Sequence, residues 1–419
     1  MTSHYASEPF VPATGFDPGP GWQWRYWSIF GGQTLSVIGS AMTQFVLIWW
    51  ITDTVGTFGA LATAGLVGLL PQALLGPIGG TFADRYSRRM LMILPDAIGA
   101  GCILVLIALF LHGSVALWHV YAAMFVRSAA AAFQMPAAAA SEAMLVPAHF
   151  LPRAAGLNQT MMGIVTVAAA PLGALAIGVM PVGMALWIDV GTAVLGIGPL
   201  LVFRVPQQRM PSESKGVWAE FCEGIAVVWR NPKLRRIYAL MTAVVLVVMP
   251  GAEMLPLLVK QHFGGGAPAV AMLEGLGGAG MVVGGGIVAL FVPKRRVSWV
   301  LWGFTLSCAM LAATALVPPS LFWLAALFWA LSGVTFILGD APFTVLIQTT
   351  VPNHLQGRVL ALLGTMMGLA APVGLLAVAP LGKILGVRWL FVLTGGLGTL
   401  VCLIALLPAV ACTEPTDRT

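Results

Sequence analysis

Charged side chains are scarce in this sequence of 419 residues. Only 9% of the residues are Asp, Glu, Lys or Arg, whereas 59% are hydrophobic and the mean hydropathy is +0.92. Soluble globular domains carry about 25% charged residues, so this composition excludes an ordinary soluble protein and predicts a polytopic helical membrane protein. A net charge of +6 would suit nucleic acid, but the positions of the charges, described below, argue against that partner.

Cysteine pairs and enzyme motifs are also lacking. The five cysteines are scattered, odd in number and contain no C-x-x-C, so we expect neither a disulfide framework nor a metal site. The sequence has no G-x-x-x-x-G-K-[ST] motif for ATP, and neither H-E-x-x-H nor G-x-S-x-G for hydrolysis. We therefore expect a protein that is not an enzyme and that needs no cofactor.

What the sequence does have is a series of long apolar segments. Each is about 20 residues or longer, enough for a helix to cross roughly 30 Å of hydrocarbon. The predicted fold is therefore all-α and integral to the membrane, with twelve transmembrane helices. Their centres are near Ile38, Leu69, Gly101, Phe125, Val165, Val194, Val247, Val282, Ser307, Trp329, Leu369 and Leu400.

The two halves of the chain repeat one another. Val146-Pro147-x-His149 recurs as Val351-Pro352-x-His354, and at the same interval Thr160-Met161-Met162-Gly163 recurs as Thr365-Met366-Met367-Gly368. Gly79-Gly80 also maps onto Gly284-Gly285. Such islands imply two pseudo-symmetric six-helix bundles related by an axis along the membrane normal.

Charge placement orients the bundles. With both termini in the cytoplasm, most of the 21 lysines and arginines fall inside, and Lys260, Lys383 and Arg388 fall outside. Trp218, Phe221, Ile225 and Val228 have helical spacing, which predicts an amphipathic helix on the inner membrane surface. The expected parts are a cytoplasmic tail 1-24, a bundle 25-205, a cytoplasmic linker 206-235, a second bundle 236-410 and a cytoplasmic tail 411-419.

The densest charge cluster in the first half is the segment Gly76–Arg89, GPIGGTFADRYSRR. It joins two bilayer-length segments, so it lies at a membrane face, and its arginine excess predicts the cytoplasmic face. Gly79 and Gly80 remove side-chain bulk where the preceding helix meets a neighbour. Asp84 can accept hydrogen bonds from amides at a nearby helix start, and the arginines can pair with it or hold the loop among the lipid headgroups.

This segment resembles the loop between helices two and three of the major facilitator superfamily, with the pattern G-x-x-x-D-R/K-x-G-R-R/K. Ser87 departs from the pattern, because the family usually has glycine there. The resemblance implies the major facilitator fold and a gating role for the loop, and the second-half loop adds Gly357 and Arg358 as candidates. The matching residues are Gly80, Asp84, Arg85, Arg88 and Arg89.

Within that superfamily the chain resembles the drug-exporting branch that includes the bacterial macrolide-efflux proteins. The resemblance runs almost end to end, and it implies antiport of drug and proton without fixing the substrate. The matching segments are WRYWSIFGGQTLSVIGSAMTQ, FVRSAAAAFQMPA, WIDV, EGIAVVWRNP and VPNHLQGRVLALLGTMMGLAAPVGL, with Asp96 early in the third span.

Ionisable groups inside spans are energetically costly, so they are the default functional candidates. Asp96 and Arg127 lie at comparable depth on adjacent antiparallel spans, so we expect a salt bridge between them, either functional or a structural staple. A carboxyl in a poorly hydrated cavity can hold a proton near neutral pH, because desolvation disfavours the charged form, and it can pair with a cationic drug. The other candidates are Asp189, Glu253, Glu274 and Asp340.

Structural alternatives stay open for these carboxyls. Asp189 can be a satisfied polar contact, Glu253 and Glu274 can snorkel to the outer surface, and Asp340 can serve a cytoplasmic gate or a helix cap. We expect Asp189 and Asp96 to couple transport to protons in the N-terminal bundle.

The function expected from the resemblance is a monomeric transporter in the bacterial cytoplasmic membrane that exports small amphipathic drugs, of macrolide or multidrug type, in exchange for protons by alternating access. An ion gradient must supply the energy because no nucleotide motif is present. Two alternatives stay open: export of an endogenous siderophore or lysolipid-like compound, and a membrane sensor that transports nothing.

Overall fold

The computed structural model describes residues 18–205, 228–229, 232–291, 296–350 and 353–406, and within them the secondary structure is helical, with no β-strand. The first half contains α1 (Trp22–Thr54), α2 (Phe58–Arg85), α3 (Arg88–Leu111), α4 (Leu117–Leu145), η1 (Ala148–Phe150), α5 (Leu151–Val179), α6 (Val182–Ala185) and α7 (Trp187–Val202). The second half contains α9 (Pro232–Glu253), α10 (Leu255–Leu258), η2 (Val259–Phe263), α11 (Ala267–Leu290), α12 (Arg296–Leu316), η3 (Pro319–Leu321), α13 (Phe322–Thr350) and α14 (Asn353–Leu406).

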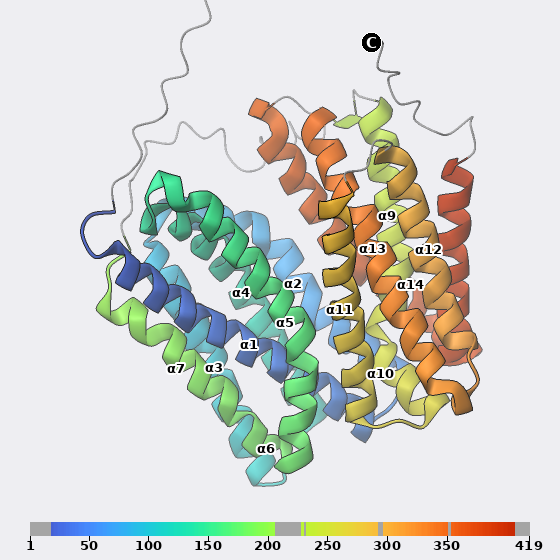
Figure 1. Ribbon diagram of the computed structural model, residues 1–419. Helices are drawn as coiled ribbons and strands as arrows, with labels where there is room; N and C mark the ends of the chain where they lie inside the picture. The colour runs from blue at the N-terminus through green and yellow to red at the C-terminus, as the bar shows by residue number, and fades with distance from the viewer. Residues whose placement is uncertain (1–17, 206–227, 230–231, 292–295, 351–352, 407–419) are drawn as a thin grey trace, which may run out of the picture.

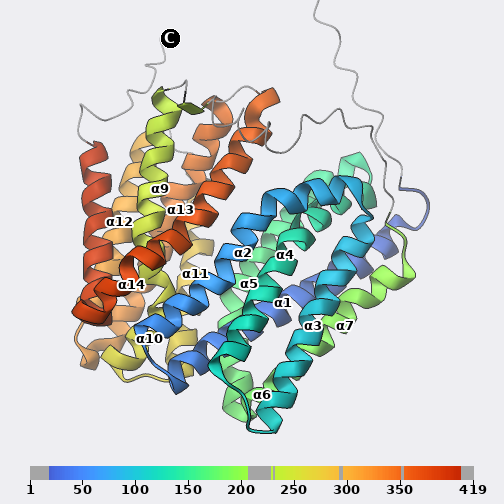
Figure 2. The same ribbon diagram turned by 180° about the vertical axis from the view of Figure 1, so that it is seen from behind.

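The helices form two groups, α1–α7 and α9–α14, which lie side by side in both views (Figure 1, Figure 2). Along their boundary α5 packs on α11 and α2 packs on α14. A Cβ added to Gly278 of α11 would lie 3.1 Å from the carbonyl oxygen of Thr166, and one added to Gly368 of α14 would lie 3.3 Å from the Cβ of Ala73. Small residues allow this approach, on which helix association in lipid depends.

Equivalent glycines close equivalent helix pairs in the two halves. Gly79 of α2 lies against the backbone of Ala132 on α4, and Gly284 of α11 lies against the backbone of Val334 on α13. If α9 and α10 are counted as one bent span, these helices hold the second and fourth places in their respective groups. The repeat seen in the sequence therefore has a counterpart in packing. Gly280, one turn from Gly284, also packs on α13.

The all-α membrane fold is confirmed, while the number of spans stays a prediction. The described residues include nine helices that are long and apolar enough to cross a membrane, or ten if the bent pair Tyr238–Glu253 and Leu255–Phe263 is one span. α4 is not among them. α14 counts once although its backbone breaks at Gly386, with φ 77° and ψ 163°. All of the predicted span centres lie within helices.

The predicted domain boundaries also stay a prediction. α1 begins at Trp22, inside the predicted tail 1-24, and α9 begins at Pro232, inside the predicted linker 206-235. The tail 411-419 and most of the predicted amphipathic helix around Trp218 lie outside the described residues.

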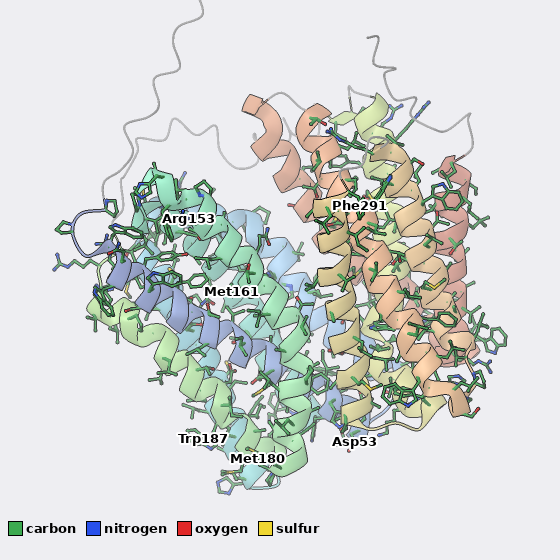
Figure 3. All side chains as sticks on the ribbon, in the orientation of Figure 1. Asp53, Arg153, Met161, Met180, Trp187 and Phe291 are labelled. Carbon is green, nitrogen blue, oxygen red and sulfur yellow. The ribbon has the colours of Figure 1, made fainter. Side chains whose placement is uncertain are left out.

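The two ends of the molecule are named here by the connections they carry. The α2–α3 end carries residues 86–87, and the α3–α4 end carries residues 112–116. α6 and α10 lie toward the α3–α4 end (Figure 1). Figure 3 shows Asp53, Met180 and Trp187 at the α3–α4 end, and Arg153 and Phe291 at the α2–α3 end.

Candidate transport cavities

A cavity of about 940 Å³ lies between the two halves, and we call it the central cavity. It extends from the α2–α3 end, where Ala83 and Ala140 line it, to Glu253 in the last turn of α9. Cavities of roughly 300–1,000 Å³ are typical for small-molecule ligands. Its position between the helix groups makes it the natural place for a compound that passes from one end of the protein to the other.

The wall of the central cavity is mostly apolar. Methionine side chains adapt to ligands of different shape, because they are flexible and polarisable. The ionisable lining residues are both acids, Glu253 and Asp340, and no Lys, Arg or His stands among the lining residues that the structure describes. The methionines in the wall are Met135, Met241, Met249 and Met367.

A second cavity, of about 630 Å³, lies inside the first half among α1, α2, α3, α4, α5 and α7. We call it the N-terminal cavity. It adjoins the central cavity, because Leu69, Gln72, Ala131 and Met135 line both. Between them the amide of Gln72 donates a hydrogen bond to the sulfur of Met135, at 2.9 Å.

Close packing of α1 on α7 positions the polar groups of the N-terminal cavity. A Cβ on Gly32 would stand 2.6 Å from the carbonyl oxygen of Leu195, and one on Gly196 would stand 2.9 Å from the Cβ of Ser36. Only small residues allow these backbones to approach so closely. As a result Ser40, one turn along α1 from Ser36, donates a hydrogen bond to Asp189 Oδ1 at 3.2 Å.

The prediction of a salt bridge between Asp96 and Arg127 is wrong. Arg127 Nη1 instead bonds Asp189 Oδ2 at 2.5 Å, and the two side chains are 14% and 3% exposed. Depth explains the difference: Asp96 lies in the part of α3 toward the α2–α3 end, whereas Arg127 and Asp189 both lie toward the α3–α4 end. The residue of α3 that faces the guanidinium is Gly99, where a Cβ would stand 3.8 Å from Nη1.

Asp96 is held by uncharged donors. Gln134 donates to its Oδ1 at 2.9 Å, Ser36 to the same oxygen at 3.3 Å, and Gln33 to Oδ2 at 3.3 Å. Asp96 is 9% exposed and lines the N-terminal cavity. Within the described residues no lysine or arginine forms an ion pair with it. A negative charge on Asp96 is therefore stabilised by hydrogen bonds from uncharged groups alone.

The predicted carboxyls of the second half are divided between two places. Glu253 and Asp340 line the central cavity and are half-buried. Glu274, on α11, does not line that cavity but lies within electrostatic reach of Glu253. The structure therefore places Glu253 and Asp340 in the wall of one cavity, and Glu274 within electrostatic reach of Glu253.

The arginines that begin α3 bond to carbonyl oxygens near the ends of neighbouring helices. Arg88 donates to Ala83 of α2 at 3.3 Å and to Ala140 of α4 at 2.7 Å. Arg89 donates to Leu200 and, at 2.7 Å, to Leu201, in the last turn of α7. Cations are favourable at helix C-termini, where carbonyls lack partners.

The other residues predicted to gate transport, in the segment between α2 and α3 and in the second-half loop, give less evidence for that role. Gly80 does not meet a neighbouring helix, contrary to expectation, because a Cβ there would have open space and the residue lines the central cavity. Arg85 is exposed. Asp84 lies in α2, and Gly357 and Arg358 lie in α14, but their side chains are outside what the structure describes. Their gating role stays a prediction.

The sequence analysis missed Glu142 and the amides that hold Asp96. Glu142 lies near the end of α4 and lines the N-terminal cavity, and its Oε1 is buried without a hydrogen-bond partner in the described part of the chain. The available signal for Glu142 was that it is an ionisable residue within the long helical segment that continues after Arg127. Gln33 and Gln134 are polar residues in spans predicted as apolar, which is a similar but weaker signal.

A polar clamp joins the two halves at the α3–α4 end. Lys260 Nζ, in η2, bonds Asp53 Oδ1 at 3.0 Å and also the carbonyl oxygens of Thr52 and Asp53, at 3.0 and 2.7 Å. Gln261 donates to the carbonyl oxygen of Gly56 at 3.0 Å. The contacts therefore connect the end of α1 to η2, at the α3–α4 end of the molecule, where Figure 3 shows Asp53.

These features define a membrane transporter. Two helical groups with matching internal packing enclose a central cavity and are clamped at one end, and residues 29–375 match the family model of the Major Facilitator Superfamily. The chain belongs to that superfamily and is a multi-pass membrane transporter, not an enzyme.

Within the superfamily, relatives of the chain include proteins named as drug-efflux proteins. The chain is 30% identical to Macrolide efflux protein A of Streptococcus pyogenes over 394 residues, covering 93% of this chain and 96% of that protein. It is 24% identical to the multidrug efflux pump Tap of Mycobacterium tuberculosis over 371 residues, covering 85% and 87%. The predicted resemblance to the drug-efflux branch is therefore confirmed.

Solved transporters share the fold at low sequence identity. A transporter of the POT family, crystallised with a thioalcohol-conjugated peptide, has a TM-score of 0.73 at 11% identity, covering 92% of this chain and 96% of that one. A bacterial homologue of the human lysosomal transporter Spinster, inward-facing and unoccupied, has a TM-score of 0.69 at 14% identity, covering 92% and 95%.

Proposed function

We propose that this transporter exports small amphipathic organic cations, of macrolide or multidrug type, across the bacterial cytoplasmic membrane in exchange for protons, by alternating access. The observation that carries the proposal is the central cavity, which combines a mostly apolar, methionine-containing wall with two carboxyls. An apolar wall accepts the body of an amphipathic molecule, and carboxylates attract its cationic group. The similarity to macrolide and multidrug efflux proteins supports the same substrate class.

The charges in the central cavity favour cations over the alternative substrates. A siderophore or a lysolipid commonly presents anionic oxygens, which Arg or Lys would bind best. Glu253 and Asp340 would repel such groups, and the described lining residues contain no base to offset them. A non-transporting sensor does not need two cavities of ligand size.

For the first half, we propose Asp96 rather than Asp189 as the carboxyl that couples transport to protons. Arg127 already neutralises Asp189, whereas Asp96 has only uncharged donors and can gain or lose a proton without breaking an ion pair. Glu253, Glu274 and Asp340 remain candidates in the second half. An antiporter requires proton and drug to prefer different states, because only differential affinity drives exchange.

Reconstitution into liposomes tests this function. With an imposed pH gradient and the fluorescent cation ethidium, we expect uphill movement of ethidium in the direction opposite to the protons. A protonophore should abolish the movement, and liposomes without protein should show none. The proposal is wrong if several amphipathic cations and macrolides all fail to move against their gradients while the protein remains folded in the bilayer.

The orientation is part of the proposal. Tags at both termini and at Ser214 should be protected from reagents outside intact cells, because the positive charges favour a cytoplasmic location for all three. Labelling of the Ser214 tag from outside would contradict the twelve-span topology. We propose that the protein works as a monomer, since each chain encloses its own cavities; light scattering in detergent can measure its mass.

A further inference from the structure

The N-terminal cavity contains more acid than base. Its lining includes Asp96, Glu142 and Asp189 against the single base Arg127. Because Arg127 is engaged by Asp189, Asp96 and Glu142 are left without a cationic partner among the described residues. Buried carboxylates are normally paired or hydrogen-bonded. Asp96 satisfies this rule through its uncharged donors, whereas Glu142 Oε1 does not.

A second buried group in the same wall also lacks a partner. Tyr26 is only 1% exposed and lines the N-terminal cavity, and its hydroxyl oxygen has no hydrogen-bond partner in the part of the chain that the structure describes. Tyr26 and Glu142 lie within electrostatic reach of each other. Buried hydroxyls nearly always have a partner, so two unsatisfied groups in one cavity wall mark a part of that wall where a ligand can bind.

Aromatic rings complete the environment of these groups. The ring of Tyr26 stacks on that of Phe30, with centroids 5.5 Å apart, and Phe30 also lines the cavity. Tyr26 further contacts Phe150 edge-on, at 5.7 Å. Ring faces attract organic cations, and the attraction grows when water is excluded. A carboxylate beside stacked aromatic rings is chemistry that recognises a bulky ammonium or phosphonium group.

We propose that the N-terminal cavity is a second binding site for an organic cation, with Glu142 as its anionic group and Tyr26 and Phe30 as its aromatic wall. Asn158 and Met161 of α5 line the same cavity, and Met161 lies between the two ends of the molecule (Figure 3). This inference rests on the proposed function and adds a second binding site for the same class of substrate. It adjoins the central cavity at Gln72 and Met135, where a cation can pass from one to the other.

Binding of radiolabelled tetraphenylphosphonium to the purified full-length protein in detergent tests the site. The background carries Glu253→Gln and Asp340→Asn, which remove both carboxyls from the central cavity. We expect this background still to bind the cation at pH 8, and we expect added Glu142→Gln to weaken binding by about tenfold or more. Triphenylphosphine oxide, which is uncharged and similar in shape, should bind equally weakly with and without Glu142→Gln.

Matched variants separate recognition from loss of folding. Glu142→Asp keeps the charge and should retain most of the affinity, and Tyr26→Phe removes only the hydroxyl and should weaken binding less than Glu142→Gln does. Size-exclusion profiles and melting temperatures identify the variants that remain folded. The inference is overturned if the folded background binds no tetraphenylphosphonium, or if Glu142→Gln leaves its affinity unchanged.

Separate measurements test the proposed site and the proposed function. Proton-driven ethidium transport by the wild-type protein reports the function, whereas equilibrium binding in the background variant reports the site. Binding without transport of any tested compound would overturn the function and retain the site. Transport with unchanged binding in Glu142→Gln would retain the function and overturn the site, leaving Glu142 as a structural residue.

Discussion

At the scale of single residues, the first half contains two acids with opposite surroundings. Asp189 is 2% exposed and bonds the guanidinium of Arg127, whereas Asp96 is surrounded by amides and a hydroxyl. A buried ion pair costs desolvation energy, and removing one partner leaves an uncompensated charge. We therefore propose a structural role for the pair of Arg127 and Asp189, and we propose Asp96 as the acid that changes its charge.

The ion pair predicts a non-additive effect on stability. Arg127→Met should lower the free energy of unfolding by about 3 kcal/mol, because it leaves Asp189 buried and unpaired. The double variant Arg127→Met/Asp189→Asn should recover most of that loss, because no charge remains. Unfolding of the purified proteins in detergent measures the cycle. Additive losses in the double variant would mean that the two side chains do not interact in the folded protein.

At the scale of helices, the two arginines at the start of α3 donate hydrogen bonds to three other helices near their ends. Arg88 reaches α2 and α4, and Arg89 reaches α7. The motif that the sequence presented as a gating loop is thus also a set of C-terminal caps in the first half. This role is independent of any gating by Asp84.

The caps predict a difference between neighbouring arginines. Arg89→Ala should lower the free energy of unfolding by about 1–2 kcal/mol, because two carbonyl oxygens of α7 lose a charged donor. Arg85→Ala is the matched control: the residue is exposed and basic but bonds to no other helix among the residues that the structure describes, so its loss should be smaller by about 1 kcal/mol. Equal losses in the two variants, measured by the same unfolding assay, would refute the capping role.

The clamp between α1 and η2 predicts a change of conformation. Lys260→Met removes three bonds between the halves and should shift the population toward a form that is open at the α3–α4 end. Spin labels at exposed His112 and Leu321 should then move apart in pulsed EPR measurements. Arg388→Met is the control, because Arg388 bonds Ala315 within the second half.

If Lys260→Met and Arg388→Met give the same distance distribution as the wild type, the clamp does not hold this end closed. If both variants widen it equally, loss of positive charge at this end matters rather than the contact across the halves.

Much of this architecture could be predicted from sequence, and the failures have physical causes. Segments such as that around Val165 are mostly apolar, so hydropathy identifies them. The partner of Arg127 could not be predicted, because it depends on how far α7 approaches α1, which the glycines Gly32 and Gly196 decide through packing. Gln134 could not be singled out either, since nothing in a span's sequence tells which amide meets Asp96.

At the scale of the whole molecule, the two cavities and the clamp fit one conformational state of a transporter. The halves are joined by polar contacts at the α3–α4 end, while the central cavity extends to the α2–α3 end. Under the proposed alternating access, the halves would rock against each other on the small residues at α2, α5, α11 and α14. The proposed exchange of drug for proton would then need carboxyls that change partner between the two states.

Coupling in the whole transporter predicts different effects of Asp96→Asn on two kinds of transport. The amide keeps the size of the side chain but cannot carry a proton, so uphill export driven by a pH gradient should be lost. Downhill exchange of labelled for unlabelled ethidium needs no net proton movement, so it should remain measurable in the same liposomes. Asp189→Asn with Arg127→Met serves as the comparison, since it removes a carboxyl and its counter-ion together and should retain part of the uphill transport.

The result that would end the proton-antiport proposal is defined by the full set of acids. If Asp96, Glu142, Asp189, Glu253, Glu274 and Asp340 can each be neutralised in a folded protein without loss of pH-driven transport, no carboxyl in or beside the two cavities couples it. If only one of them abolishes uphill transport and spares exchange, that residue carries the proton. Finding Glu253 or Asp340 in this role would move coupling into the central cavity, where drug and proton would compete for one carboxyl rather than act at separate sites.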